Sequence, residues 1–519
     1  MRARIPGSKS ARQLLLLVLT PLLAFIALGA WAVASPVGAS PDDDFHLANI
    51  WCSTGEIEGT CEPYPEDPRQ RVVPETLAEA AECYKWQGDV DASCIDELSS
   101  DRMEPTDRIN RSSYPPVYYF TMGLIAGDDF DEVSVVLLRL VNVLLFVGVA
   151  LGLYLLLPHR LRSTSLWMWL IGLVPLGVFL IASNNPSAWA IISGGTVWLA
   201  TYGYFLARGW RRWSLLGLAI VAALMGAGAR ADAAVYAGVG FLVASVLAAE
   251  RSRRYLLSVL PFVAAAVLAG AMFLATRQSG VLSSGLTGSS DPSELNTAGL
   301  IFRNLTEVPS LWAGVFGTWQ LGWLDTEMPA IVWASALGVF AAMCFLGLRS
   351  ISWRKWTALA IIWAALILVP VWVLVQSRVI VGAEVQPRYI LPLMVMLGGV
   401  ALLQLPGRLI DPTKTQLWVV GVALSLANSV ALHTSIRRYI SGDEIADWNL
   451  DRHVEWWWDM PITPMVVWAV GSAAFAGAAA LVLRALWRIQ RSASLRSLEH
   501  REPTAVVPAE PEARADSRG

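Results

Sequence analysis

Residues 13–46 read QLLLLVLTPLLAFIALGAWAVASPVGASPDDDFH, an apolar run followed by three consecutive aspartates and a histidine. The apolar part is about twenty residues long, which is enough for a helix that spans a bilayer. Asp42, Asp43, Asp44 and His46 are therefore expected at the membrane surface, where helix ends usually carry aromatic or basic residues instead. A carboxylate cluster held there suits an enzyme that acts on a membrane-embedded substrate.

The composition of the chain favours an integral membrane protein. Of its 519 residues 55% are hydrophobic and only 16% are charged, so most of the chain is expected to contact the lipid bilayer. The formal net charge of −3 argues against a nucleic-acid partner, which would require a basic face. Arginine outnumbers lysine 35 to 4, a usage typical of GC-rich bacterial genomes.

Further apolar runs predict an all-α polytopic membrane protein with about 12 transmembrane helices. Two neighbouring pairs of runs are separated by very short polar turns and are expected to form tight hairpins. The twelve runs are 13–33, 133–157, 165–182, 188–206, 213–229, 232–249, 255–275, 328–347, 356–375, 389–404, 415–433 and 462–483, and the hairpins are 165–182/188–206 and 213–229/232–249.

Basic and acidic loops alternate along the chain and predict its orientation. The loop 36–132 carries 22 acidic and 6 basic side chains, whereas the N-terminus and alternate loops are basic. By the positive-inside rule, both ends are cytoplasmic and the acidic loop lies outside a bacterial plasma membrane. Alternatively, the first segment is a signal peptide cleaved near residues 32–35.

The expected organisation has nine parts. It comprises a cytoplasmic N-terminus (1–12), the first transmembrane helix (13–33), an outer loop domain (34–132), transmembrane helices 2–7 (133–275), an outer loop with an interfacial helix (276–327), helices 8–11 (328–433), an outer Trp-rich loop (434–461), the last transmembrane helix (462–487) and a disordered cytoplasmic tail (488–519). The interfacial helix is expected within 301–324, and Trp456–Trp458 is expected to anchor the protein at the membrane surface.

Four of the five cysteines lie in the acidic loop. An oxidising compartment outside the membrane permits disulfides there, and four cysteines allow three pairings. A zinc site is the alternative, although the spacings match no common ligand pattern. The four are Cys52, Cys61, Cys83 and Cys94.

Six short motifs follow one another along the chain, mostly near the expected outer ends of helices. They are Pro41-Asp42-Asp43-Asp44-Phe45-His46, Tyr114-Pro115-Pro116-Val117-Tyr118-Tyr119, Arg139-Leu140-Val141-Asn142, Asn185-Pro186-Ser187, Gly322-Trp323-Leu324-Asp325 and Gln386-Pro387-Arg388-Tyr389-Ile390-Leu391-Pro392. Together they resemble the GT-C membrane glycosyltransferases. They most resemble a bacterial family described only as predicted membrane proteins, whose opening motif is P-D-E-x-x-H. Asp43 stands where that family usually has glutamate.

The resemblance implies transfer of a sugar from a polyprenyl-phosphate donor to a cell-envelope glycan, lipid or protein at the outer face. Asp42 would be the general base, and Asp43 and His46 would orient it or raise its pKa. Arg230 and Arg388 are candidates for the donor phosphate, because arginine binds phosphate through a bidentate fork. The substrate-binding residues implied are Tyr114, Tyr118, Arg139, Asn185, Arg230, Asp325, Arg388 and Tyr389.

Simpler roles are open for several of these residues. The aspartates could cap the helix that begins near Phe45, and His46 could be a surface histidine. Arg139 could pair structurally with a neighbouring helix, Arg230 and Asp232 could form a local ion pair, and Arg388 could be an interfacial anchor. Asp42 and Asp43 could bind Mg²⁺ or Mn²⁺.

Two other classes of function are open for the whole chain. One is a transporter or flippase of lipid-linked sugars, whose polar residues would gather near mid-membrane. The other is a non-catalytic cell-envelope assembly protein that binds a partner through the loop with the four cysteines.

Overall fold

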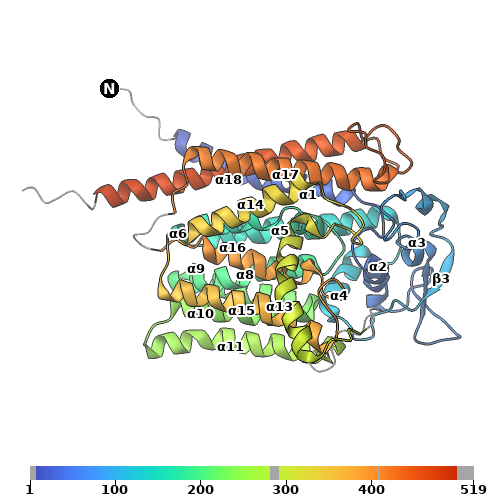
Figure 1. The fold of residues 1–519 in the computed structure, drawn as a ribbon, viewed down its shortest axis with the longest axis horizontal. Coiled ribbons are helices and arrows are strands. Elements are labelled where there is room, and N and C mark those ends of the chain that lie inside the picture. Colours follow the sequence, from blue (N-terminus) through green and yellow to red (C-terminus); the bar gives the residue numbers. More distant parts are fainter. Residues whose placement is uncertain (1–6, 281–291, 406–409, 500–519) are drawn as a thin grey trace, which may run out of the picture.

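The computed structural model describes residues 7–280, 292–405 and 410–499, which form a helical bundle with a small domain at one end (Figure 1). The elements of the bundle are α1 (Gly7–Val33), α5 (Glu132–Leu156), α6 (His159–Gly172), α7 (Leu176–Ile181), α8 (Ser187–Leu206), α9 (Trp210–Ala229), α10 (Ala231–Ala248), α11 (Arg253–Leu274), η3 (Arg277–Gly280), α13 (Thr297–Ala313), the π-helical turn η4 (Gly314–Thr318), α14 (Ala330–Gly347), α15 (Trp353–Gln376), α16 (Pro387–Ala401), α17 (Lys414–Ser441) and α18 (Pro464–Glu499).

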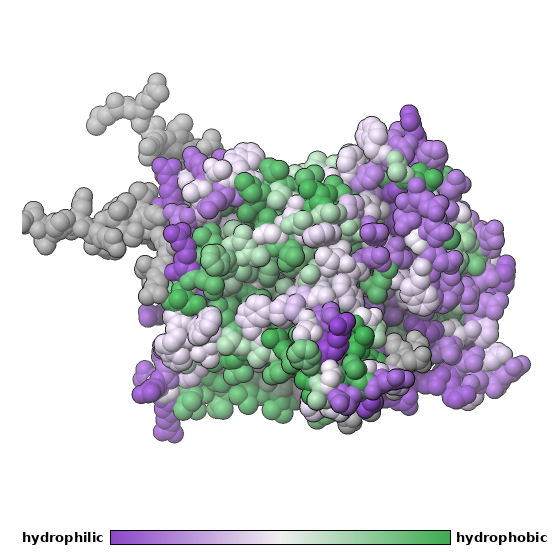
Figure 2. Space-filling model, in the orientation of Figure 1, coloured by the Kyte–Doolittle hydropathy of each residue, from purple (hydrophilic) through white to green (hydrophobic). Residues whose placement is uncertain are grey.

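Within the described residues, nine helices are long and apolar enough to cross a membrane, rather than the twelve expected. Figure 2 shows the apolar side chains as a band between two hydrophilic ends. The three other predicted spans are shorter, broken or enclosed. The run 165–182 breaks into α6 and α7 around Leu173–Pro175, α16 has 15 residues, and α8 is surrounded by other helices.

α8 and α16 form the centre of the bundle. Seventeen of the 20 residues of α8 and 14 of the 15 residues of α16 are buried. The two helices approach closely where glycine removes a side chain, because a Cβ at Gly194 would lie 2.6 Å from that of Pro392. α1, α17 and α18 pack on one side of this centre and α9, α10, α11 and α15 on the other (Figure 1).

The outer loop 34–132 is a small domain at one end of the bundle (Figure 1). It contains a three-stranded antiparallel sheet of order β1-β2-β3, in which Val72 pairs with both Glu62 and Pro105. Its core continues into the bundle through Trp189 and Tyr439. Its elements are α2 (Asp43–Trp51), η1 (Cys52–Thr54), β1 (Glu62–Pro63), β2 (Arg71–Pro74), α3 (Glu75–Glu79), η2 (Ser93–Glu97), β3 (Met103–Thr106) and α4 (Pro116–Ala126).

The four cysteines of this domain form two disulfides, Cys52–Cys61 and Cys83–Cys94. The prediction of disulfides is confirmed, and the structure selects one of the three pairings. The zinc alternative is excluded because all four sulfur atoms are paired with one another. Each bond closes a short loop, with sequence separations of 9 and 11 residues.

We expect that the double substitution Cys83→Ser/Cys94→Ser lowers the free energy of unfolding by about 2–3 kcal/mol, because it frees a short loop in the unfolded chain. Thermal unfolding of the purified protein in detergent, with and without reductant, measures this change. Reductant should lower the midpoint of the wild type further than that of the variant. Equal shifts in both proteins would show that this disulfide adds no stability.

The ends of the described chain lie together at the opposite end of the bundle from the loop domain (Figure 1). Several loops predicted to be cytoplasmic lie near one another at this same end: residues 160, 162, 404 and 405 line one cavity with Arg488, and Lys355 donates to the carbonyl of Leu403. Three boundaries differ from those expected. α17 extends to Ser441 and α18 to Glu499, so 434–441 and 488–499 are helical, and the helix expected within 301–324 ends at Ala313 before η4. The remainder of the predicted tail, 500–519, lies outside the described residues, as do the N-terminal residues 1–6.

The run Trp456–Trp458, predicted to anchor the protein at the membrane surface, makes contacts within the protein. Trp456 is buried in the core of the loop domain, and the indole nitrogen of Trp458 donates to the carbonyl of Val33 at 2.8 Å. This run therefore fastens the 442–461 loop to the end of α1.

Candidate functional site

Asp42 adopts a conformation that is uncommon for a residue other than glycine. Its φ of 61° lies in the left-handed region, which asparagine and aspartate tolerate better than other side chains. It occupies the N-cap position of α2, yet its side chain makes no capping hydrogen bond. Helix capping therefore does not explain Asp42, and its carboxylate points elsewhere.

The backbone just before Asp42 is fixed by two predicted site residues. The side-chain amide of Asn185, in the turn between α7 and α8, donates to the carbonyl of Pro41 at 2.7 Å. Arg388, in the first turn of α16, donates to the same carbonyl at 3.2 Å. Asn185 is fully buried and thus fixes the backbone that leads into Asp42.

The three consecutive aspartates form ion pairs with three arginines, of which Arg108 lies near both Asp42 and Asp44. Arg388 Nη2 lies 2.6 Å from Asp42 Oδ2, although the two residues are 346 positions apart. Arg139 Nη2, from α5, lies 4.0 Å from Asp43 Oδ2, and Arg108 contacts Asp44 with two nitrogens at 3.0 Å. The aspartate run thereby joins three separate segments of the chain.

The Asp42–Arg388 pair lies within a cluster of cationic and aromatic groups. The guanidinium carbons of Arg230 and Arg388 lie 4.8 Å and 5.1 Å from the ring centroid of Tyr389, within the usual range of cation–π contacts. Arg230 also lies 6.0 Å from the ring of Tyr114. The side chain of Asp42 is 32% exposed, whereas that of Arg388 is 3% exposed. The carboxylate is thus the accessible part of the pair.

The partner Arg388 stabilises the negative charge of the Asp42 carboxylate. Burial alone would raise the pKa of Asp42, but the nearby Arg388 guanidinium lowers that pKa to about 2. The alternative that its neighbours raise this pKa is wrong, because Arg388 and Arg108 both lie within ion-pair distance of the Asp42 carboxylate. While Arg388 remains in place, Asp42 is ionised and is a weak base.

Arg139 is a clamp for the connection between α1 and α2. Its guanidinium donates to the carbonyls of Ala32 (3.0 Å), Ser35 (2.6 Å) and Pro36 (2.6 Å) and is almost fully buried. These contacts fit the structural alternative for Arg139, in which it pairs with a neighbouring part of the protein. Asp43 beside it accepts from the hydroxyl of Ser40 at 2.5 Å, and burial raises the pKa of Asp43 to about 6.

His46 is fully buried, so the interpretation of it as a surface histidine is wrong. Its Nδ1 lies 2.8 Å from the hydroxyl of Tyr119, and its buried Nε2 has no hydrogen-bond partner among the described residues. Burial lowers the pKa of His46 to about 3 in spite of the nearby Asp42 carboxylate. The imidazole is therefore neutral, and it packs against the rings of Tyr114 and Tyr119.

We expect His46 to make the protein less stable as the pH falls below 6.5. The unfolded chain protonates its histidine near pH 6.5, whereas folded His46 resists protonation down to about pH 3, so the free energy of unfolding decreases across that interval. Asp43 acts in the opposite sense, because its raised pKa favours the folded state as the pH falls from about 6 to 3.8.

The variant His46→Gln should remove the histidine contribution and retain that of Asp43. Its unfolding midpoint should fall less than that of the wild type, or rise, when the pH is lowered from 7.5 to 5. The exposed His453, as His453→Asn, provides the matched control and should keep the wild-type profile. Parallel profiles for His46→Gln and the wild type would show that His46 titrates normally in the folded protein.

Two of the predicted residues lie away from the carboxylate of Asp42. Tyr118 is fully buried and packs edge-on against Trp189. Asp325 accepts from Arg438 at 3.0 Å in a buried ion pair, and Arg438 also donates to the backbone carbonyls of Tyr84 and Val90. This pair locks the loop domain onto the end of α17.

Arg108 also belongs to this cluster, although it is not among the residues that the sequence motifs indicate. Arg108 pairs with Asp44, lies 3.9 Å from Asp42 Oδ1 and is 45% exposed. The sequence does contain a signal for Arg108, because it is one of only six basic residues in the acidic loop. The local ion pair expected between Arg230 and Asp232 is present, with nitrogen–oxygen distances of 2.9 Å and 2.8 Å.

The arrangement of these acids does not fit a metal site. Among residues 7–280, 292–405 and 410–499, no group of three or more His, Cys, Asp or Glu side chains is placed to hold a metal ion. Asp42 and Asp43 instead face two different arginines. The site is organised by guanidinium groups, which bind anions.

No curated protein and no solved structure matches this chain. A family model with the description "Predicted membrane protein (DUF2142)" matches residues 25–397. The matched span runs from within α1 to within α16, and it includes Asp42, Asn185, Arg230 and Arg388. The chain therefore belongs to this family of predicted membrane proteins.

Proposed function

We propose that the Asp42–Arg388 pair is the reaction centre of a membrane glycosyltransferase. The donor would be a polyprenyl-phosphate sugar, and the acceptor would be a hydroxyl group of a cell-envelope glycan, lipid or protein. The observation that carries the proposal is the placement of Asp42. Its carboxylate does not cap its own helix. It instead accepts a hydrogen bond from Arg388, which lies 346 residues away in the sequence, at the end of the apolar band.

The cluster has the charges that such a reaction needs. The leaving group is a lipid phosphate, and Arg388 and Arg230 can stabilise the negative charge that develops on it. The half-buried Tyr389 keeps both guanidinium groups near one ring. Because the donor is already activated by its phosphate, the reaction requires no nucleotide.

The pairing of Asp42 with Arg388 suggests how the base becomes active. A donor phosphate competes with Asp42 for Arg388, and loss of that guanidinium raises the pKa of Asp42 toward the working range of a general base. Asp42 then accepts the proton of the acceptor hydroxyl, whose oxygen bonds to the anomeric carbon of the sugar. The bond between that carbon and the phosphate oxygen breaks, and the polyprenyl phosphate leaves with the electron pair.

Proteoliposomes containing the full chain and a panel of radiolabelled polyprenyl-phosphate sugars provide the test. We expect transfer or slow donor hydrolysis with the wild type and a large loss with Arg388→Gln. Arg452→Gln, at an exposed arginine of the 442–461 loop, is the matched control and should retain activity. Donor movement across the bilayer without bond cleavage would make the protein a transporter, and donor binding without either activity would favour an assembly protein.

A further inference from the structure

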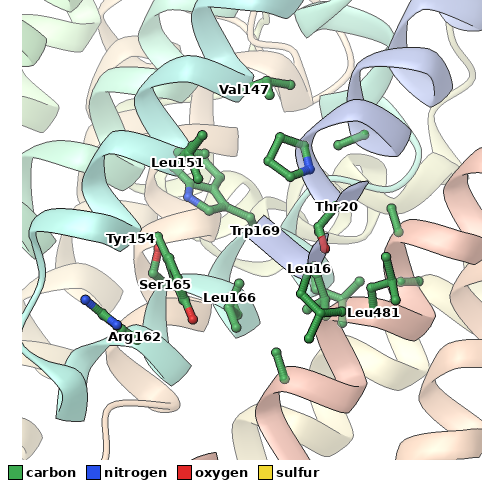
Figure 3. A pocket seen from close by; sticks show the side chains of 18 of the residues that line it. Leu16, Thr20, Val147, Leu151, Tyr154, Arg162, Ser165, Leu166, Trp169 and Leu481 are labelled. Carbon is green, nitrogen blue, oxygen red and sulfur yellow. The ribbon is translucent and has the colours of Figure 1, made fainter. Parts of the chain in front are cut away.

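A second feature lies at the other end of the bundle. A cavity of about 1480 Å³ opens between α1, α5, α6 and α18, with further contributions from α7 and the segment after α16. It exceeds the range of about 300–1,000 Å³ that is common for sites of small soluble ligands. Figure 3 shows side chains from three parts of the chain around it, including Leu16, Val147, Leu166 and Leu481.

The cavity is about as deep as one leaflet of the bilayer. Along α1 it extends from Leu16 to Leu28, which corresponds to about 18 Å at the helical rise of 1.5 Å per residue. The hydrocarbon core of a bilayer is about 30 Å thick. The cavity ends before Ala32, where the connection that carries Asp42 is clamped by Arg139. It is thus separate from the proposed reaction centre.

The wall and the mouth of the cavity differ in chemistry. Leucine, valine, alanine and phenylalanine make up most of the wall, whereas Arg160, Arg162 and Arg488 line the end near the chain termini. Arg162 lies over the ring of Tyr154 and donates to the carbonyls of Leu155 and Leu157 (Figure 3). In the part of the chain that the structure describes, no carboxylate forms an ion pair with Arg160 or Arg162. The mouth therefore keeps a positive charge.

We propose that this cavity is a binding site for an anionic phospholipid of the leaflet on the side of the termini. The phosphate would lie at Arg160 and Arg162, and the acyl chains would fill the apolar wall. Basic pockets between transmembrane helices commonly bind anionic headgroups, and an apolar cavity excludes water in favour of hydrocarbon. A donor whose phosphate reaches Arg388 has its headgroup at the opposite face, so it does not account for this mouth.

Native mass spectrometry of the delipidated full chain tests the charge of the ligand. We expect phosphatidylglycerol to bind about tenfold or more tightly than phosphatidylcholine with the same acyl chains. Arg160→Gln/Arg162→Gln should abolish this preference. Arg208→Gln/Arg211→Gln, at two exposed arginines of the same end outside the cavity, should retain it.

A second variant tests the apolar part while leaving the charges in place. Ala150→Phe/Ala478→Phe fills the cavity and should reduce the binding of both phospholipids. Equal binding of the two lipids by the wild type, or a preference that survives Arg160→Gln/Arg162→Gln, would overturn the proposal. Tighter binding of a long-chain polyprenyl monophosphate than of phosphatidylglycerol would overturn it in favour of a carrier-lipid site.

Discussion

Asp42→Asn is expected to reduce sugar transfer by about 10²- to 10⁴-fold, the usual contribution of a positioned general base. Asparagine tolerates the left-handed backbone of Asp42 and makes no worse a helix cap, since the aspartate makes no capping hydrogen bond. The fold should therefore survive. Donor binding should be unchanged or tighter, because Arg388 no longer shares its charge with a carboxylate.

Separate measurements of turnover and of donor binding distinguish a general base from a structural residue. The turnover number and the donor dissociation constant are measured in the same proteoliposomes, with Asp101→Asn as the control. Asp101 is an exposed acid of the loop domain, and its variant should behave like the wild type. Weaker donor binding with an unchanged turnover number would assign Asp42 to substrate binding and exclude it as the base.

Arg139→Met is expected to lower the free energy of unfolding by about 3–5 kcal/mol, the range for removal of one partner from a buried ion pair. The variant leaves Asp43 without its cation and three backbone carbonyls without donors. Unfolding of the purified protein in mixed micelles measures the change. Asp43→Asn/Arg139→Met should recover part of the loss, since it removes the unpaired carboxylate.

The exposed arginine Arg303 provides a matched control. It pairs with Glu307 across one helical turn and is 56% exposed, so Arg303→Met should change the free energy of unfolding by less than about 1 kcal/mol. An equal effect of the two substitutions would show that the Arg139 clamp adds no special stability.

The sequence predicts which residues lie at the same face of the membrane better than it predicts the contacts that these residues make. Alternation of apolar and polar runs places Asp42 and Arg388 at the same face, and the structure joins them at 2.6 Å. Hydropathy cannot show that Arg139 binds carbonyls at and just beyond the end of α1, because these contacts depend on how α5 packs against α1. Nor does the run of aspartates reveal that three arginines surround it, so the sequence does not give the direction of the pKa shift of Asp42.

Among the described residues, fewer helices have the length and hydropathy of a membrane span than the apolar runs predict, for a related reason. A helix enclosed by other helices needs no continuous lipid-facing surface, so α8 contains Ser193, Gly194, Gly195 and Thr196 at its centre. Around Pro175 the chain breaks one apolar run into two helices. Disulfides were predicted from the location of the cysteines, but their pairing depends on the fold of the loop domain.

The three arginines that meet the aspartate run also impose an order on biosynthesis. During synthesis Asp42–Asp44 leave the ribosome long before Arg388, and domains generally fold from the N-terminus onward. Arg108 and Arg139 become available early and lie near all three carboxylates, whereas Arg388, the nearest partner of Asp42, is available only after the insertion of α16. A chain truncated before residue 388 would thus leave Asp42 with only Arg108, at 3.9 Å, and would lack the Asp42–Arg388 pair. The Asp42–Arg388 contact can accordingly form only after the bundle has been assembled as far as α16.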